Sequence, residues 1–227
     1  MDFLNSLLVV KLELLPFLVL SLLISFTVHE FAHAYSAWKF GDPTAKMLGR
    51  VSLNPRKHID FRGMLLFVIA GFGWARPVPV NRDNFKKPRA MGIVVSAVGP
   101  LSNLLLAFIG TLVLHLGFKL GFVDVGSGNR IHLALFYFLS FLISNNVLLF
   151  LFNLIPLPPL DGYRIVEDLA PAHVRSRLQQ IEQWSIFIFL IIVFIPVLRD
   201  KTLGPLFSLI QPIMREMSRA AMFIVGS

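Results

Sequence analysis

Long apolar runs separated by short polar stretches organise this chain. Residues 14–39, 91–120 and 131–155 are each long enough to cross the hydrocarbon core of a bilayer as a helix. Residues 184–198 form a shorter run, a span or half-span. Residues 199–227 have the amphipathic pattern typical of an interfacial helix, with a fifth span as the alternative. The pattern predicts an all-α polytopic membrane protein, a bundle of about four to six transmembrane helices.

The segment between the first two runs, residues 39–91, is the most basic part of the chain, with eleven Lys or Arg against three Asp. By the positive-inside rule we expect it on the cytoplasmic side. Residues 63–74 within it are apolar but too short to span, which favours a re-entrant or interfacial segment. Residues 51–55 and 75–81 look extended, with prolines that restrict them to a sheet edge. We therefore expect a small β-hairpin at the membrane surface, whose open edge could take an unwound peptide as an added strand; a polar loop with turns is the alternative.

Composition supports the membrane assignment. Hydrophobic residues make up 56% of the chain and charged residues 15%, and the mean hydropathy is +0.72, which excludes an ordinary soluble domain. Because the net charge of +8 is concentrated after the first run, it indicates membrane topology, and no nucleic-acid partner is expected. No internal repeat is present, so we expect one integral-membrane domain over residues 1–227, with a catalytic core at about 14–170 and C-terminal helices at about 171–227.

Two histidines and a glutamate stand inside the first apolar run, in the sequence His-Glu-Phe-Ala-His. His29 and His33 are four residues apart, so both imidazoles lie on one helix face and can bind one metal ion. Glu30 lies about 100° further round, where it can reach a water molecule at the metal but is poorly placed to bind the metal itself. Ionisable residues inside an apolar span are expensive and usually functional, so the pattern indicates a zinc hydrolase. The alternative is that these residues simply end a membrane helix at the interface.

A catalytic zinc site needs a third protein ligand and an open position. The chain has no cysteine, so this ligand must be a histidine or a carboxylate. The prolines after the third run break the helix, which allows Asp161 to turn back into the bundle on the side of the histidines; a helix N-cap is its alternative role. Asp161 is the best placed of the candidates, which also include His58, Asp60, Glu167 and Asp168.

Asn103 in the second run and Asn146 and Asn153 in the third are candidates for polar roles inside the bundle. Asn103 follows Gly99-Pro100 and needs an interhelical partner, so we favour a structural role over a part in the active site. Asn146 and Asn153 are seven residues apart and share a helix face, and this polar line could bring water to a buried metal.

Three motifs, in order on three successive runs, resemble the site-2 protease family of intramembrane zinc metalloproteases, peptidase family M50. They are His-Glu-Phe-Ala-His at 29–33, Gly-Pro-Leu-Ser-Asn at 99–103 and Asn-Leu-Ile-Pro-Leu-Pro-Pro-Leu-Asp-Gly at 153–162. The resemblance implies that His29, His33 and Asp161 bind one Zn²⁺. It also implies that Glu30 is the general base and that Asn153 holds the substrate carbonyl or the oxyanion.

The resemblance covers roughly residues 14–170 and extends to the small bacterial members, which lack PDZ and CBS domains. It implies a multi-pass protein of the cytoplasmic membrane, with its active site toward the cytoplasm, that cleaves transmembrane protein substrates in the lipid bilayer. We expect substrates with helix-weakening residues. One alternative is a membrane zinc protease that acts on soluble or lipidated proteins and uses a downstream glutamate as the third ligand. Another is a non-enzymatic zinc-binding or transport protein.

Overall fold

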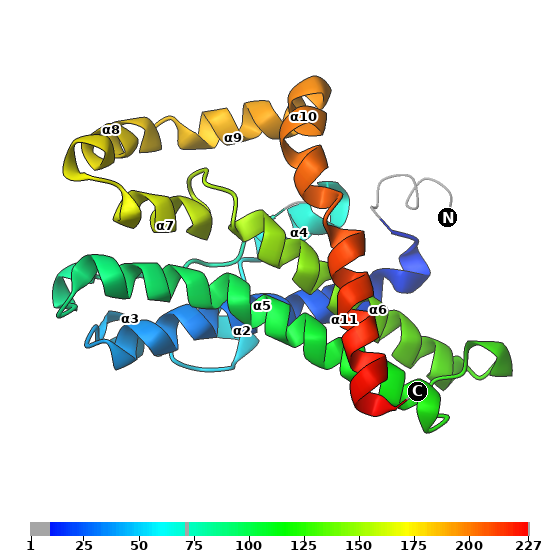
Figure 1. Ribbon diagram of the computed structural model, residues 1–227. Helices are drawn as coiled ribbons and strands as arrows, with labels where there is room; N and C mark the ends of the chain where they lie inside the picture. Colours follow the sequence, from blue (N-terminus) through cyan, green and yellow to red (C-terminus); the bar gives the residue numbers. More distant parts are fainter. Residues whose placement is uncertain (1–9, 71–72, 227) are drawn as a thin grey trace.

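The computed structural model describes residues 10–70 and 73–226. Its centre consists of three long helices, α2 (Leu15–Lys39), α5 (Pro88–Lys119) and α6 (Arg130–Asn153), each packed against the other two (Figure 1). Among the described residues, three helices are long and apolar enough to cross a membrane, judged by length and composition. They coincide with the three long runs, so the prediction of an all-helical membrane protein with these spans is confirmed.

Shorter helices surround this centre. α7 lies between α5 and α8, and α11 crosses α5 and α6 (Figure 1). The shorter helices are α3 (Thr44–Met47), α4 (Phe61–Ala70), α7 (Asp161–Leu169), α8 (Ala172–Glu182), α9 (Ser185–Phe194), α10 (Pro196–Phe207) and α11 (Ile210–Val225), and the 3-10 turns are Leu12–Leu14, Pro55–Lys57, Arg82–Asn84 and Val125–Ser127.

The shorter fourth run is divided in the structure. α9 has 10 residues, which at 1.5 Å per residue is about 15 Å, half the thickness of a bilayer core. Pro196 begins α10, and it disfavours helix at the residue before it, so α9 cannot continue. Of the about four to six predicted spans, the described residues therefore supply three of full length.

The predicted β-hairpin is wrong, because no strand occurs in residues 10–70 or 73–226. The alternative, a loop with turns, describes this segment better, and α4 occupies part of the apolar stretch expected to be re-entrant. Residues 73–81, which we call the strap, run without regular structure beside α2. Pro77 and Pro79 have no N–H to give a strand partner, and Arg76 donates its N–H to the carbonyl of His58 at 2.8 Å instead.

Side chains at the end of α2 hold the strap in place. Asp42 is fully buried, and its carboxylate accepts hydrogen bonds from the Asn81 N–H at 2.7 Å, from the side chain of Asn84 at 2.8 Å and from Thr44. Burial alone would raise the pKa of Asp42, but these hydrogen bonds outweigh it, so the pKa is lowered. The carboxylate therefore stabilises the fold above its ordinary pKa of about 4, and this contribution is lost as the pH falls through the lowered pKa.

Replacement of Asp42 by alanine should loosen the strap. The Asp42→Ala variant leaves the donors of Asn81 and Asn84 without their acceptor, which should lower the free energy of unfolding by about 1–3 kcal/mol. Thermal unfolding in detergent and amide exchange at Asn81 measure the effect. Asp83→Ala is the matched control, because Asp83 is exposed. Equal amide exchange in the two variants would contradict the anchoring role of Asp42.

Candidate metal centre

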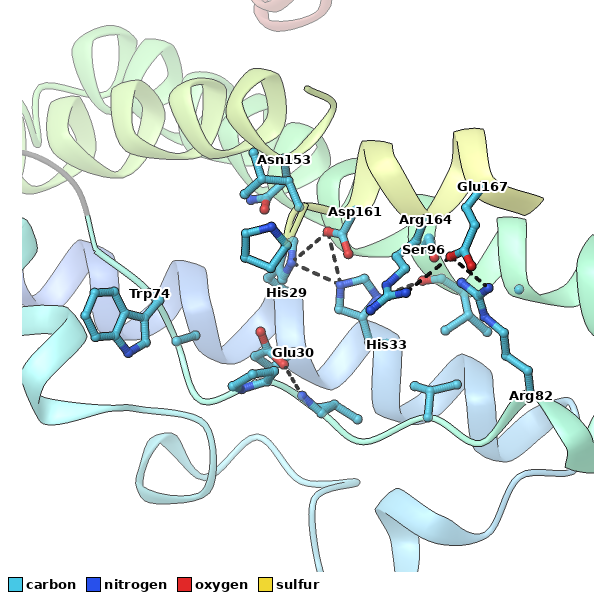
Figure 2. A pocket seen from close by; sticks show the side chains of 18 of the residues that line it. His29, Glu30, His33, Trp74, Arg82, Ser96, Asn153, Asp161, Arg164 and Glu167 are labelled. Atoms are coloured by element: carbon cyan, nitrogen blue, oxygen red, sulfur yellow. Dashed lines mark hydrogen bonds and ion pairs between the residues drawn. The ribbon is translucent and has the colours of Figure 1, made fainter. Parts of the chain in front are cut away.

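Side chains from two separate helices converge on one point (Figure 2). The Nε2 atoms of His29 and His33, on α2, lie 3.0 Å apart. The Oδ2 atom of Asp161, the first residue of α7, lies 3.2 Å from Nε2 of His29 and 3.3 Å from Nε2 of His33. The structure thus brings together the three residues predicted as metal ligands, and they form a group that could hold a metal ion.

The hydrogen bonds behind the two imidazoles indicate where their protons are. Nδ1 of His33 lies 2.7 Å from the carbonyl oxygen of Val95, and Nδ1 of His29 lies 2.7 Å from Oδ1 of Asn103. Both oxygens can only accept, so each Nδ1 carries the hydrogen and each Nε2 of a neutral ring presents a lone pair. Oδ2 of Asp161 is buried without a hydrogen bond. With both rings neutral these three acceptors would repel one another, and a cation between them would remove the repulsion, so the residues fit a metal ion.

The donor set favours zinc. Two imidazole nitrogens and one carboxylate oxygen leave a fourth position of a tetrahedral zinc site open, which is the arrangement of catalytic zinc centres. The ring nitrogens that face away from the site are both hydrogen-bonded, as metal-binding histidines generally are. With Asp161 and Glu30 both ionised, a divalent cation would leave the buried site near neutral, which a low-dielectric interior tolerates.

Glu30 lies next to the ligand group without joining it (Figure 2). Its side chain is buried, and Oε2 accepts a hydrogen bond of 2.9 Å from the N–H of Val78 in the strap. This contact holds the carboxylate beside the histidines and ties the strap to α2. Glu30 therefore occupies the place expected for a general base, beside the metal position but outside its ligands.

The start of α7 places Asp161. Leu160 is the N-cap of this helix, and no side chain caps it, so the alternative role of Asp161 as a helix N-cap is not found. A Cβ atom on Gly162 would lie 2.2 Å from the carbonyl oxygen of Leu154, so the chain after α6 can fold back this closely only with glycine at 162.

Buried ion pairs with the turn before α5, and hydrogen bonds from α5 itself, hold the other end of α7. The guanidinium of Arg82 lies 2.7 Å from Oδ1 of Asp168 and 3.6 Å from Oε2 of Glu167, and both acids are 2% exposed. Arg89 of α5 donates to the carbonyls of Asp168 and Ala170 at the end of α7. Since paired buried charges resist displacement, these contacts fix the helix that carries Asp161.

The remaining candidate ligands lie elsewhere. Glu167 accepts hydrogen bonds from Arg164 at 3.2 Å and from Gln179 at 2.9 Å, and neither it nor Asp168 belongs to the ligand group. Asp60 accepts the first N–H groups of α4, from Arg62 and Gly63. His58 is fully buried, with Nε2 2.6 Å from the carbonyl of Ser52, so it holds the loop before the strap.

The asparagines have three different environments. Asn153 lines the cavity at the site, and its Nδ2 donates to the carbonyl of Leu149 at 2.9 Å. Asn146 is fully buried and does not line that cavity, so the water path predicted along Asn146 and Asn153 stays a prediction. The N–H groups of Asn146 turn to α2 and to its own helix. Asn103 combines both roles considered for it, because it bonds to another helix and to a histidine of the site.

Gly99 is a site residue whose role the sequence did not reveal. A Cβ atom there would lie 2.2 Å from Nε2 of His33 and 2.8 Å from Cε1 of His29. The backbone of α5 at Gly99 therefore packs directly against both imidazoles, in a place that we call the floor of the site. Pro100 follows within the same helix, and it removes the N–H that would bond to the carbonyl of Ser96, which loosens this turn.

A cavity of about 720 Å³ extends over the site. The strap forms one wall through Trp74, Ala75 and Val78, and charged side chains including Arg82 and Arg164 line another part. The ligand group and Glu30 thus face a space large enough for an extended peptide segment.

Comparisons with known proteins agree with this site. A model of "Peptidase family M50" matches residues 119–196. A Bacillus subtilis (strain 168) protein named "Putative zinc metalloprotease YwhC" is 53% identical over 185 residues, which cover 82% of this chain and 83% of that protein. The chain belongs to peptidase family M50.

More distant M50 relatives carry similar names. "Putative zinc metalloprotease Rip2" of Mycolicibacterium smegmatis is 32% identical over 78% of this chain and 66% of its own length. The Rip2 protein of Mycobacterium tuberculosis (strain H37Rv) is 27% identical over 80% of this chain and 68% of its own length. No solved structure matches the chain. M50, the site-2 protease family, consists of zinc-dependent metalloproteases, and the His-His-Asp group described above fits that metal.

Substitution of Gly99 by alanine should abolish zinc binding. The added methyl group would occupy the position of the His33 ligand atom, and the α5 backbone that carries it cannot shift like a side chain. We expect less than about a tenth of the wild-type zinc content after purification, measured by elemental analysis. Gly110→Ala on the same helix is the control, because the atoms nearest to its methyl group belong to the side chains of Ile143, at 3.1 Å, and Leu142, at 3.6 Å. Full zinc content in Gly99→Ala would contradict the role of Gly99 as the floor of the site.

Proposed function

We propose that this M50 protein is an intramembrane protease that hydrolyses peptide bonds within or near the transmembrane segments of membrane proteins, as in regulated intramembrane proteolysis. The observation that carries the proposal is the position of His29, Glu30 and His33. They lie near the end of α2, a helix apolar and long enough to span, and are buried between it and α5. A site placed there meets its substrate at the depth of the membrane rather than in open solvent.

The ligands of the proposed centre are His29, His33 and Asp161. Zinc bound there would lower the pKa of a water molecule and polarise the carbonyl group of the substrate. The three ligands would hold the ion and would leave one of its coordination positions open toward the cavity.

Glu30 is the proposed general base. Its carboxylate faces the same cavity and is held by the N–H of Val78, so it can accept a proton from the attacking water and return it to the leaving amine.

Asn153 is the proposed hydrogen-bond donor to the substrate carbonyl and to the oxyanion that forms from it. One N–H of its Nδ2 is used by Leu149, and its amide has a second N–H for a substrate.

The strap is the proposed docking edge for an unwound substrate. Arg76 and Val78 bond toward the protein through their N–H groups, so the opposite edge belongs to the alternate residues. Those include Pro77 and Pro79, which have carbonyl groups but no N–H. A substrate segment would therefore pair mainly by donating its own N–H groups, which requires that its helix be open. This favours substrates with helix-weakening residues.

The charge distribution along the chain suggests the membrane and the side on which the protein acts. Residues 39–91 are strongly basic and follow the end of α2 nearest the site, so we place the active site toward the cytoplasmic side of the cytoplasmic membrane. The proposed partners are a transmembrane protein substrate and the lipid bilayer.

Neither alternative explains the site as well. A protease that uses a downstream glutamate as third ligand would need Glu167, whose carboxylate is bound by Arg164 and Gln179. A zinc transport protein would have no use for a buried carboxylate held beside the ligands without joining them, as Glu30 is.

Glu30→Gln should separate zinc binding from catalysis. The amide keeps the size of Glu30 but cannot take a proton, so we expect wild-type zinc content and a fall in turnover of about 10²–10⁴-fold. Purified wild type and variant are incubated with a panel of single-span substrates, and the cleavage position is mapped by mass spectrometry. Soluble peptides of the same sequence are the control. Equal products from both proteins, or cleavage of soluble peptides alone, would overturn the proposal.

Asn153→Ala should affect the chemical step. Loss of a donor to the developing oxyanion should lower kcat by about 10²–10³-fold, while zinc content stays at the wild-type level because Asn153 is not one of the proposed ligands. Single-turnover kinetics on a cleaved substrate measure this. A normal kcat with a raised KM would instead assign Asn153 to substrate binding.

A further inference from the structure

A chain of buried amides runs from His29 into the centre of the helix bundle. Oδ1 of Asn103 accepts the hydrogen of the His29 Nδ1 at 2.7 Å. Nδ2 of Asn103 donates to Oδ1 of Asn146 at 2.8 Å and, at 3.3 Å, to the carbonyl of Ser25. Asn103 and Asn146 are both fully buried. These contacts join α2, α5 and α6 at the level of the metal centre.

The hydrogen bonds of Asn146 determine how the amide groups of both asparagines are oriented. Nδ2 of Asn146 donates to the carbonyl of Leu142 and to Oγ of Ser25, both at 2.7 Å. Ser25 in turn donates to the carbonyl of Ser21 at 2.6 Å. A backbone carbonyl cannot donate, so the NH₂ group of Asn146 must face Leu142 and its Oδ1 must face Asn103.

The orientation of the Asn146 amide determines, through Asn103, which ring nitrogen of His29 carries the hydrogen. With Oδ1 of Asn146 facing it, Asn103 must present its NH₂ group to Asn146 and its oxygen to His29, which places the ring hydrogen on Nδ1. If both amides turned over, Asn103 would present a donor to Nδ1, and the hydrogen would move to Nε2. In that tautomer Nε2 has no lone pair for a metal.

The two histidines differ in this respect. His33 is oriented directly by the backbone carbonyl of Val95, which no substitution of a side chain removes. His29 depends on two side chains, one of which, Asn146, touches neither the ligands nor the cavity. Polar groups buried at membrane depth are costly, so a function for the pair is expected.

We infer that Asn146 is a positioning residue that, through Asn103, holds His29 in its metal-binding tautomer. This inference rests on the proposed zinc centre. The carbonyl of Leu142 sets the direction of the relay, and the contact of Asn103 with Ser25 supports it at a longer distance. Loss of Asn146 should therefore weaken zinc binding without removing any ligand.

Asn145 provides a matched control on the same helix. It is also buried, and its Nδ2 donates to Ser21 Oγ at 2.7 Å, the same distance at which Asn146 donates to Ser25 Oγ. Asn145→Leu and Asn146→Leu therefore each remove one buried amide and one hydrogen bond to a serine of α2. The relay to His29 is broken in Asn146→Leu and intact in Asn145→Leu.

The test measures the zinc dissociation constant of purified, folded protein by chelator competition, together with thermal unfolding of the zinc-free form. We expect Asn146→Leu to raise the zinc Kd by at least about tenfold, and Asn145→Leu to stay within about twofold of wild type. Similar Kd values for the two variants, whether both normal or both raised, would overturn the inference. If wild type itself binds no stoichiometric zinc, the proposed function fails instead.

A second arm separates tautomer control from packing. Asn103→Asp places a carboxylate against Nδ1 of His29, and since a carboxylate can only accept, it holds the Nδ1–H tautomer whatever stands at position 146. The Kd of the double variant Asn103→Asp/Asn146→Leu should therefore be no higher than that of Asn103→Asp alone. If the Asn146→Leu effect reappears at full size in the double variant, position 146 acts through packing and the inference is wrong.

Discussion

The central constraint on the structure is the convergence of three buried atoms that can each bind a metal ion. Nε2 of His29, Nε2 of His33 and Oδ2 of Asp161 face one another at 3.0–3.3 Å between apolar helices. Interactions between charges and lone pairs are strong where the effective dielectric constant is low, so a cation bound between these atoms would stabilise the group, provided that the surroundings hold each atom in place. The hydrogen bonds and ion pairs around the site keep these three atoms in position.

Each ligand is held from the side opposite the metal position. The carbonyl of Val95 holds His33 and the amide of Asn103 holds His29, both from α5. Asp161 has no such contact of its own, so its position depends on α7, which is secured by the buried pairs of Arg82 with Glu167 and Asp168. The strap ends next to Arg82, and its Val78 binds Glu30, so the wall of the cavity and the helix of the third ligand are linked. A shift of the strap would therefore affect both the base and a ligand.

Membership of family M50 and the burial of the site between spans explain why so much polarity lies inside an apolar bundle. The proposed protease would need a cation, a base and a hydrogen-bond donor at the depth of its substrate, each held without help from bulk water. The asparagines and serines between α2, α5 and α6 are hydrogen-bonded to one another and to backbone carbonyls, as buried polar groups generally are. The charged lining near Arg82 and Arg164 provides a polar end to the cavity.

The sequence alone determined the three candidate spans and the shared helix face of the two histidines. Apolar runs of sufficient length specify α2, α5 and α6, and the spacing of His29 and His33 specifies one shared helix face, because both properties are local. The tertiary structure decided what depends on contacts distant in the chain. It replaced the expected hairpin by a strap that bonds to Glu30 and Asp42, and it placed Gly99 under the imidazoles and Asn146 behind one of them. These roles follow from the packing of three helices against one another, which no local pattern encodes.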